Sequence, residues 1–169
     1  TGAGLIGVDA GNYSLLSVAT TTADIDALGI TGSFTADNKV YDATTTASVL
    51  TQTLAGVIGI DDVSLIGGTA DFDTKNADLN KIVTLTGAGL IGVDAGNYSL
   101  LSVDTAAADI TALGITGNFT AANKVYDATT AATVTRTLTT VLAGDVVTLT
   151  GTASFGDKTV GTGKTVTIA

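Results

Sequence analysis

TGAGLIGVDAGNYSLLSV, residues 1–18, occurs again without a change as residues 86–103. The repeat period is therefore 85 residues, and by direct count 41 of the first 50 residues match their partners 85 positions further on. After residues 49 and 134 the copies diverge and differ in length by two residues, yet DVSLIGGTADF at 62–72 still aligns with DVVTLTGTASF at 145–155. A period of this length indicates a repeated small domain rather than a short solenoid turn.

Short runs rich in Thr, Val, Ile and Ala alternate with Gly, Asn and Asp within each period. β-branched side chains favour strands, and the interleaved residues favour turns, so the pattern is typical of a β-sandwich or barrel. The fold class we expect is all-β: tandem immunoglobulin-like β-sandwich repeats of about 85 residues. The expected strands of the first period are 5–8, 13–18, 30–35, 47–54, 63–66, 69–72 and 81–85.

The repeat is out of register with the sequence. If units begin near residue 25, then 25–109 is a complete repeat, 110–169 is the N-terminal part of another, and 1–24 is the C-terminal part of a third. Ala19–Asp24 and Asp104–Asp109 contain no Gly/Ser spacer, so we expect short and stiff junctions between units.

The two partial segments are complementary, and an incomplete sandwich exposes an open strand edge. One interpretation is that residues 1–24 of one chain complete residues 110–169 of a neighbouring chain, head to tail, by strand complementation. The other is that the sequence is a window of a longer continuous chain. In both cases the expected partners are neighbouring repeats.

Composition excludes several function classes. The 16 acidic residues, all Asp, outnumber 7 basic ones to give a net charge of −9, which argues against nucleic acid as a partner. No apolar run is long enough for a membrane span and no signal-peptide pattern is present, so we expect any targeting signal outside this sequence. His, Cys and Glu are missing, which removes the commonest catalytic bases and nucleophile partners, so we expect no enzyme activity.

Two motifs recur in the same order. NKVYDATT stands at 38–45 and 123–130, and AGNY at 10–13 and 95–98. With these motifs the chain resembles the YDG repeat domain of very large bacterial exoproteins of the filamentous-haemagglutinin and adhesin type. The motif residues are Lys39, Tyr41, Asp42, Lys124, Tyr126, Asp127, Asn12, Tyr13, Asn97 and Tyr98.

The resemblance implies a secreted β-sandwich array on the bacterial cell surface, with no catalytic residues to carry over. The usual Gly after Tyr-Asp is replaced by Ala43 and Ala128, so we expect a turn that avoids positive φ. The four tyrosines occupy equivalent positions in each unit, which favours core or turn packing over a binding stripe.

The function we expect is a structural stalk or extender repeat of an extracellular adhesin, fibre or biofilm filament. The alternative is an adhesive module that binds a glycan or a host protein through loops near Asp61–Asp62 or 71–80, where the copies diverge. The sequence does not indicate the adhesive target.

No cofactor is expected, apart from a calcium hypothesis at Asp71, Asp73 and Asp78, whose oxygens suit a hard cation. The second copy replaces this region largely with Gly156, Asp157, Thr159 and Gly161, which argues against a repeat-wide site. An intramolecular isopeptide bond from Lys39 or Lys81 to an Asn is a further alternative; the simpler interpretation is that the Lys39 stem covers Tyr41.

Overall fold

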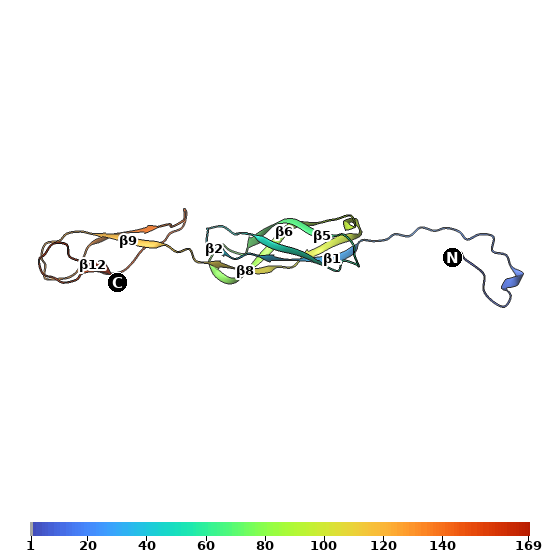
Figure 1. The fold of residues 1–169 in the computed structure, drawn as a ribbon, viewed down its shortest axis with the longest axis horizontal. Coiled ribbons are helices and arrows are strands. Elements are labelled where there is room, and N and C mark those ends of the chain that lie inside the picture. The colour runs from blue at the N-terminus through green and yellow to red at the C-terminus, as the bar shows by residue number, and fades with distance from the viewer. Residues whose placement is uncertain (1) are drawn as a thin grey trace.

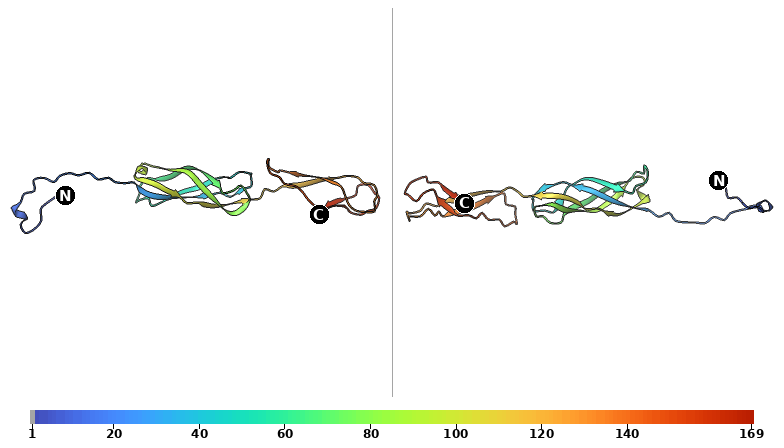
Figure 2. Two further views of the ribbon diagram at one scale, coloured as in Figure 1. Left: turned by 180° about the vertical axis from the view of Figure 1, so that it is seen from behind. Right: turned by 90° about the horizontal axis from the view of Figure 1, so that it is seen from below.

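The computed structural model describes residues 2–169; residue 1, the first of the 1–24 segment, lies outside the described residues. Three parts follow one another along a single long axis: an extended N-terminal segment, a complete unit, and a smaller C-terminal unit (Figure 1). Both views in Figure 2 show the same elongated outline. The elements are η1 (Ala10–Asn12), β1 (Leu28–Ala36), β2 (Lys39–Val40), β3 (Thr46–Ala47), β4 (Val49–Ala55), β5 (Ser64–Phe72), β6 (Asp78–Ile91), η2 (Ala95–Asn97), β7 (Tyr98–Val103), β8 (Ala106–Thr111), β9 (Thr116–Ala121), β10 (Val134–Thr139), β11 (Ala153–Phe155) and β12 (Val166–Ile168).

The expectation of an all-β fold is confirmed. The described residues contain no α-helix, only the two single 3-10 turns η1 and η2. None of their helices is long and apolar enough to cross a membrane.

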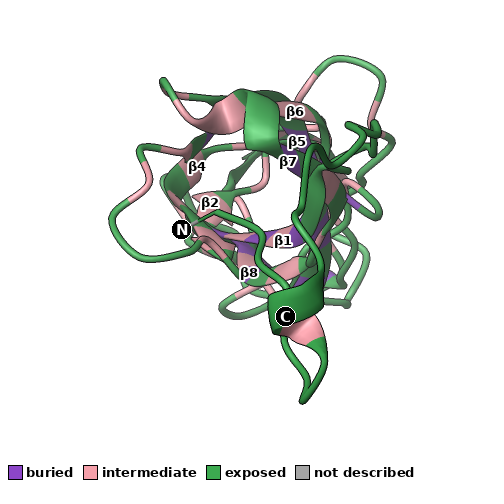
Figure 3. Ribbon diagram, turned by 90° about the vertical axis from the view of Figure 1, so that its right-hand side faces the viewer, coloured by how far each residue is buried: buried purple, intermediate pink, exposed green. Residues whose placement is uncertain are grey.

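The complete unit consists of two sheets around one core. One sheet has the strand order β4-β1-β7, and the other has the order β2-β8-β6-β5-β3. Phe34 of the first sheet packs against Phe72, Val83 and Ile110 of the second. Seen along the long axis, the strands form a ring and the buried residues are short stretches of these strands (Figure 3). Along β1, for example, buried residues alternate with less buried ones. Alternate side chains of each strand therefore point into the core.

The segment Asp104–Asp109, which the sequence analysis treats as a junction, is mostly strand β8. This strand pairs with β6 antiparallel and with β2 parallel, so it lies inside the larger sheet. Ala108 and Ile110 face the core and are buried. The expectation of a linker here was wrong because three alanines in a row with Asp and Thr carry little hydrophobic signal. The unit ends at Thr111, and residues 112–115 form the connection.

The strand boundaries also differ from expectation. The runs 63–66 and 69–72 are one continuous strand, β5, that carries Gly67 and Gly68 in its middle. The run 81–85 is part of the 14-residue strand β6. In the N-terminal segment, the expected strands 5–8 and 13–18 do not form, although the identical sequence at 98–103 is strand β7. A strand needs a partner, and this extended segment has no neighbour to pair with among the described residues.

The C-terminal unit contains two separate antiparallel pairs, β9 with β10 and β11 with β12. Over the aligned stretch this unit is two residues shorter than the complete unit. The two residues that it lacks correspond to Leu50, at a bulge beside β1, and to one glycine of the Gly67-Gly68 pair. The structural partner of Asp145 is therefore Asp61, not Asp62 as the ungapped alignment indicates. The amide of each donates to the carbonyl three residues earlier, of Leu142 and Ile58 respectively.

Candidate functional site: lysine-closed turns and the junction between units

The Tyr-Asp motif forms an Asx turn. Asp42 Oδ1 accepts hydrogen bonds from the backbone amide and the hydroxyl of Thr44, each at 2.9 Å. Asp127 and Thr129 repeat both bonds at the same lengths. The side chain thus replaces a backbone partner and fixes the loop.

The ammonium group of Lys39 closes this turn. Its Nζ donates to Asp42 Oδ1 at 2.8 Å and to three further oxygens at 3.0 Å: the Thr44 carbonyl, the Thr44 hydroxyl and the Thr46 carbonyl. An ammonium has three hydrogens, so at least one of them is shared between two acceptors. The same Nζ lies 5.5 Å from the centre of the Phe72 ring, a cation–π contact that joins the turn to the core.

The second copy repeats the lysine-closed turn atom for atom. Lys124 Nζ donates to Asp127, to the Thr129 carbonyl and hydroxyl, and to the Ala131 carbonyl, and it lies 5.5 Å from the Phe155 ring centre. Lys39 belongs to a complete unit and Lys124 to an incomplete one, so the closed turn does not depend on the missing strands. It is a local device.

The lysines keep the turn aspartates ionised. The Lys39 hydrogen bond, followed by the Thr44 amide and hydroxyl, lowers the pKa of Asp42 from 3.8 to about 2. Lys124 and Thr129 lower the pKa of Asp127 to about 2 in the same way. Both ion pairs therefore persist at acidity that begins to protonate an ordinary aspartate.

The AGNY motif forms the 3-10 turn η2 and begins strand β7. It is held by backbone hydrogen bonds without a side-chain cap. Tyr98, just after Asn97, is buried, donates its hydroxyl to Asp61 Oδ2 at 2.6 Å, and accepts the Ile58 amide at 3.1 Å. Asp61 raises the pKa of Tyr98, because ionising the hydroxyl would lose the bond and add a second negative charge.

Asp145 joins the two units. Its Oδ2 accepts the Tyr41 hydroxyl at 2.8 Å, and its Oδ1 accepts Lys75 Nζ at 3.0 Å. The carboxylate is mostly buried, with 18 % of its side chain exposed, and the Tyr41 bond and then Lys75 lower its pKa. Lys75 also lies 5.8 Å from the Tyr41 ring centre. Asp145 of the C-terminal unit is thus held by Tyr41 and Lys75 of the complete unit that precedes it.

A model of the YDG domain family matches residues 25–108 and again residues 109–169. This chain belongs to the YDG domain family. No curated protein and no solved structure matches it. The YDG motif thus coincides with the lysine-closed turn, and its tyrosine, Tyr41, faces the next unit.

The alanine in the glycine position of the YDG motif takes a positive φ. The angle is 66° at Ala43 and 62° at Ala128, so the expectation that alanine avoids this conformation was wrong. The closed turn imposes the left-handed conformation, because Asp42 binds the Thr44 amide and Lys39 binds Asp42 and the Thr44 carbonyl, so the backbone on both sides of Ala43 is held. An L-residue is strained there by about 1–2 kcal/mol.

Replacing Ala43 by Gly is expected to stabilise the complete unit by about 1 kcal/mol, because glycine adopts positive φ without that strain. Urea denaturation followed by circular dichroism would measure it. Ala47→Gly is the matched control: Ala47 lies in strand β3 and is not among the positive-φ residues, so a loss of about 0.5–1 kcal/mol is expected. A loss at Ala43 equal to that at Ala47 would contradict the strain argument.

Two further lysines close turns that the sequence analysis missed. Lys164 binds Asp157 and both the carbonyl and hydroxyl of Thr159, which gives a third turn of the form Asp-x-Thr closed by a lysine. Lys81 is buried and pairs with Asp73 at 2.7 Å. The sequence signal was present, since three of the four Asp-x-Thr triplets have a lysine within seven residues, and the fourth, at 109–111, has none.

The calcium hypothesis gains no support from the geometry. Asp71 accepts the Thr45 hydroxyl, Asp73 pairs with Lys81, and Asp78 accepts the next backbone amide. Among residues 2–169 no group of three or more acidic side chains is placed to hold a metal ion.

The isopeptide alternative also gains none, because the oxygens around Lys39 and Lys81 come from Asp, Thr and backbone groups. Of the four tyrosines, Tyr98 is buried and Tyr41 packs against the core, but Tyr13 and Tyr126 are exposed. The expectation that the tyrosines pack in the core or in turns was wrong for Tyr13 and Tyr126, because the segments that would cover them do not lie against them within residues 2–169.

Proposed function

We propose that this chain is a spacer of an extracellular bacterial stalk or fibre, of the filamentous-haemagglutinin and adhesin type, built from immunoglobulin-like YDG units. The observation that carries the proposal is the Asp145 junction. A carboxylate gripped by Tyr41 and Lys75 fixes the orientation of one unit against the next, which a stiff spacer needs and a freely jointed array does not.

The loops proposed for an adhesive surface have internal partners. Asp61 binds Tyr98, Lys75 binds Asp145, and Asp73 binds Lys81. The sequence differences between the copies in these loops are therefore explained by packing within each unit and by contacts at the junction between units. We propose no catalytic role, since Asp42, Asp127 and Asp157 are each paired with a lysine that suppresses their basicity.

A glycan array and a panel of immobilised matrix proteins, probed with the fluorescently labelled chain, test this proposal. A spacer is expected to give no signal above that of a labelled inert protein. Reproducible binding that is lost in the Asn76→Ala, Asp78→Ala double variant would overturn it in favour of the adhesive module, because both residues lie in the candidate loop and outside the lysine-closed turns.

A further inference from the structure

The strands at the start of the complete unit pair with the strands at its end. β1 pairs with β7 in parallel over five register positions, which begin at Leu28 opposite Tyr98, and β2 pairs with β8 in parallel over two. In the described part of the chain every other ladder is antiparallel. We call residues 28–40, which contain β1 and β2, the entry segment, and residues 98–111, which contain β7 and β8, the exit segment.

Both segments cross together from one sheet to the other. β1 and β7 belong to the smaller sheet, whereas β2 and β8 belong to the larger one. Two further bonds join the segments around the crossing. The Asp104 amide donates to the Gly32 carbonyl at 2.9 Å, and the Asp109 amide donates to the side-chain oxygen of Asn38 at 2.7 Å. The entry and exit segments are therefore hydrogen-bonded to each other in both sheets.

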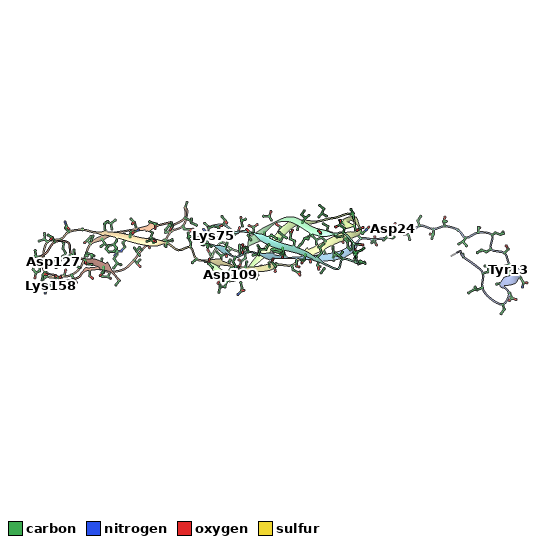
Figure 4. The ribbon with its side chains drawn as sticks, in the orientation of Figure 1. Tyr13, Asp24, Lys75, Asp109, Asp127 and Lys158 are labelled. Carbon is green, nitrogen blue, oxygen red and sulfur yellow. The ribbon has the colours of Figure 1, made fainter. Side chains whose placement is uncertain are left out.

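Tension along the chain pulls these two segments in opposite directions. Asp24 lies beyond one end of the complete unit, and Asp109 lies near the opposite end (Figure 4). The strands of the unit run lengthwise between these ends (Figure 1). A pull therefore draws the entry segment toward one end and the exit segment toward the other, so that they slide along each other. Because the bonds of a parallel ladder are evenly spaced along the sliding direction, sliding loads them all at the same time.

The strands that receive the pull first are interior strands of their sheets. β1 lies between β4 and β7, and β8 lies between β2 and β6. Ile30 and Phe34 of the entry segment and Ile110 of the exit segment are buried in the core. Neither segment can peel away from an outer edge, because leaving the unit breaks a ladder on each side and exposes core side chains to water.

The lysine-closed turn anchors the far end of the entry segment. Lys39 is the first residue of β2, and its Nζ binds the carbonyls of Thr44 and Thr46. Thr46 begins β3, which pairs with β5 and belongs to neither segment. For β2 to slide, Lys39 has to leave these oxygens. The YDG turn thus ties the loaded entry segment to strands that the pull does not load directly.

We propose that the complete unit is a mechanical clamp, in which the parallel pairing of residues 28–40 with residues 98–111 resists tension along the chain. Under load the unit keeps its length until the bonds between the two segments break together, and it then releases its whole chain in one step. This role goes beyond the spacer function, because a spacer needs stiff junctions but no resistance to unfolding by force.

Single-molecule force spectroscopy in two pulling directions tests the clamp. The chain has no cysteine of its own, so handles can be attached to introduced ones, all at exposed positions. Asp24→Cys with Ala112→Cys loads the two segments in shear. Ser64→Cys with Val93→Cys instead opens the β5–β6 ladder from the end where Ser64 pairs with Ile91, so that its pairs break one after another. The shear direction is expected to need a several-fold higher force and to release about 300 Å of chain in one step. Equal forces in both directions, or a stepwise extension in shear, would overturn the proposal.

Two single hydrogen bonds supply a matched pair of variants. Asn38→Ala removes the bond to the Asp109 amide, which joins the entry segment to the exit segment. Gln52→Ala removes a bond of the same kind, from Gln52 Nε2 to the Gly67 carbonyl at 2.8 Å, which joins β4 to β5 outside the clamp. Both variants should lose similar stability in urea, but only Asn38→Ala should lower the rupture force in shear, because forced unfolding follows the unfolding rate. An equal fall in force for both variants, or none for Asn38→Ala, would contradict the clamp.

The clamp and the spacer function fail separately. The handles enclose only residues 24–112, so the Asp145 junction is outside the loaded path, and glycan binding has no influence on the rupture forces. A complete unit that yields as easily in shear as in the other direction would refute the clamp and leave the spacer function standing. Specific binding on the glycan array would overturn the spacer function and leave the clamp standing.

Discussion

Replacing Lys39 by Met is expected to lower the free energy of unfolding of the complete unit by about 2–4 kcal/mol. Methionine keeps most of the stem's apolar volume, so the change isolates the ammonium. It leaves the Thr44 and Thr46 carbonyls and Asp42 without their shared donor, and it removes the charge above the Phe72 ring. The lysine side chain is only 16 % exposed, so water replaces these bonds incompletely.

Lys75→Met is the matched control in the same unit. Lys75 is 44 % exposed and has one ion pair, to a different unit, so its loss should cost the complete unit less than about 1 kcal/mol. Both variants can be compared by urea titration of the far-UV circular dichroism signal. If the two losses are equal, the lysine-closed turn does not hold the fold as described.

Repetition made much of this fold predictable. The identity between 1–18 and 86–103 defines the period, and Thr-rich runs between Gly and Asp turns identify strands without reference to tertiary structure. The Asx turn at Asp42 followed from its type and position, because an aspartate two residues before an amide is a local arrangement.

Strand β8 was not predictable in the same way. Its sequence, AAADIT, reads as a polar linker, and it is a strand only because β6 and β2 lie on either side of it. Ala108 belongs to the buried core cluster and Ala106 packs against it, so this strand contributes to the core with small side chains. Tertiary pairing here overrides local propensity.

Dependence on a strand partner also explains why two identical sequences differ in structure. Residues 13–18 and 98–103 share every residue, yet only the second copy is a strand. The lysine-closed turns lie between these extremes: the spacing of Lys39 and Asp42 is visible in the sequence, but the Phe72 ring beneath the lysine is brought there by the fold.

The Asp145 junction carries the central claim that successive units form a stiff stalk. Asp145→Ala removes both the Tyr41 and the Lys75 bonds while leaving the cores of the two units untouched. We expect the units to reorient freely about residues 112–115 in this variant. Asp37→Ala, at an exposed carboxylate of the complete unit away from these bonds, is the control and should change nothing.

The most direct measurement is a pulsed electron paramagnetic resonance distance between spin labels on Thr84→Cys in β6 and Thr135→Cys in β10, two exposed strand positions on either side of the junction. Excess unlabelled chain restricts the signal to distances within one molecule. The structure predicts a single narrow distance distribution for the parent chain and for Asp37→Ala, and a broad one for Asp145→Ala. A broad distribution in the parent chain, or an unchanged narrow one in Asp145→Ala, would contradict a stalk stiffened at Asp145.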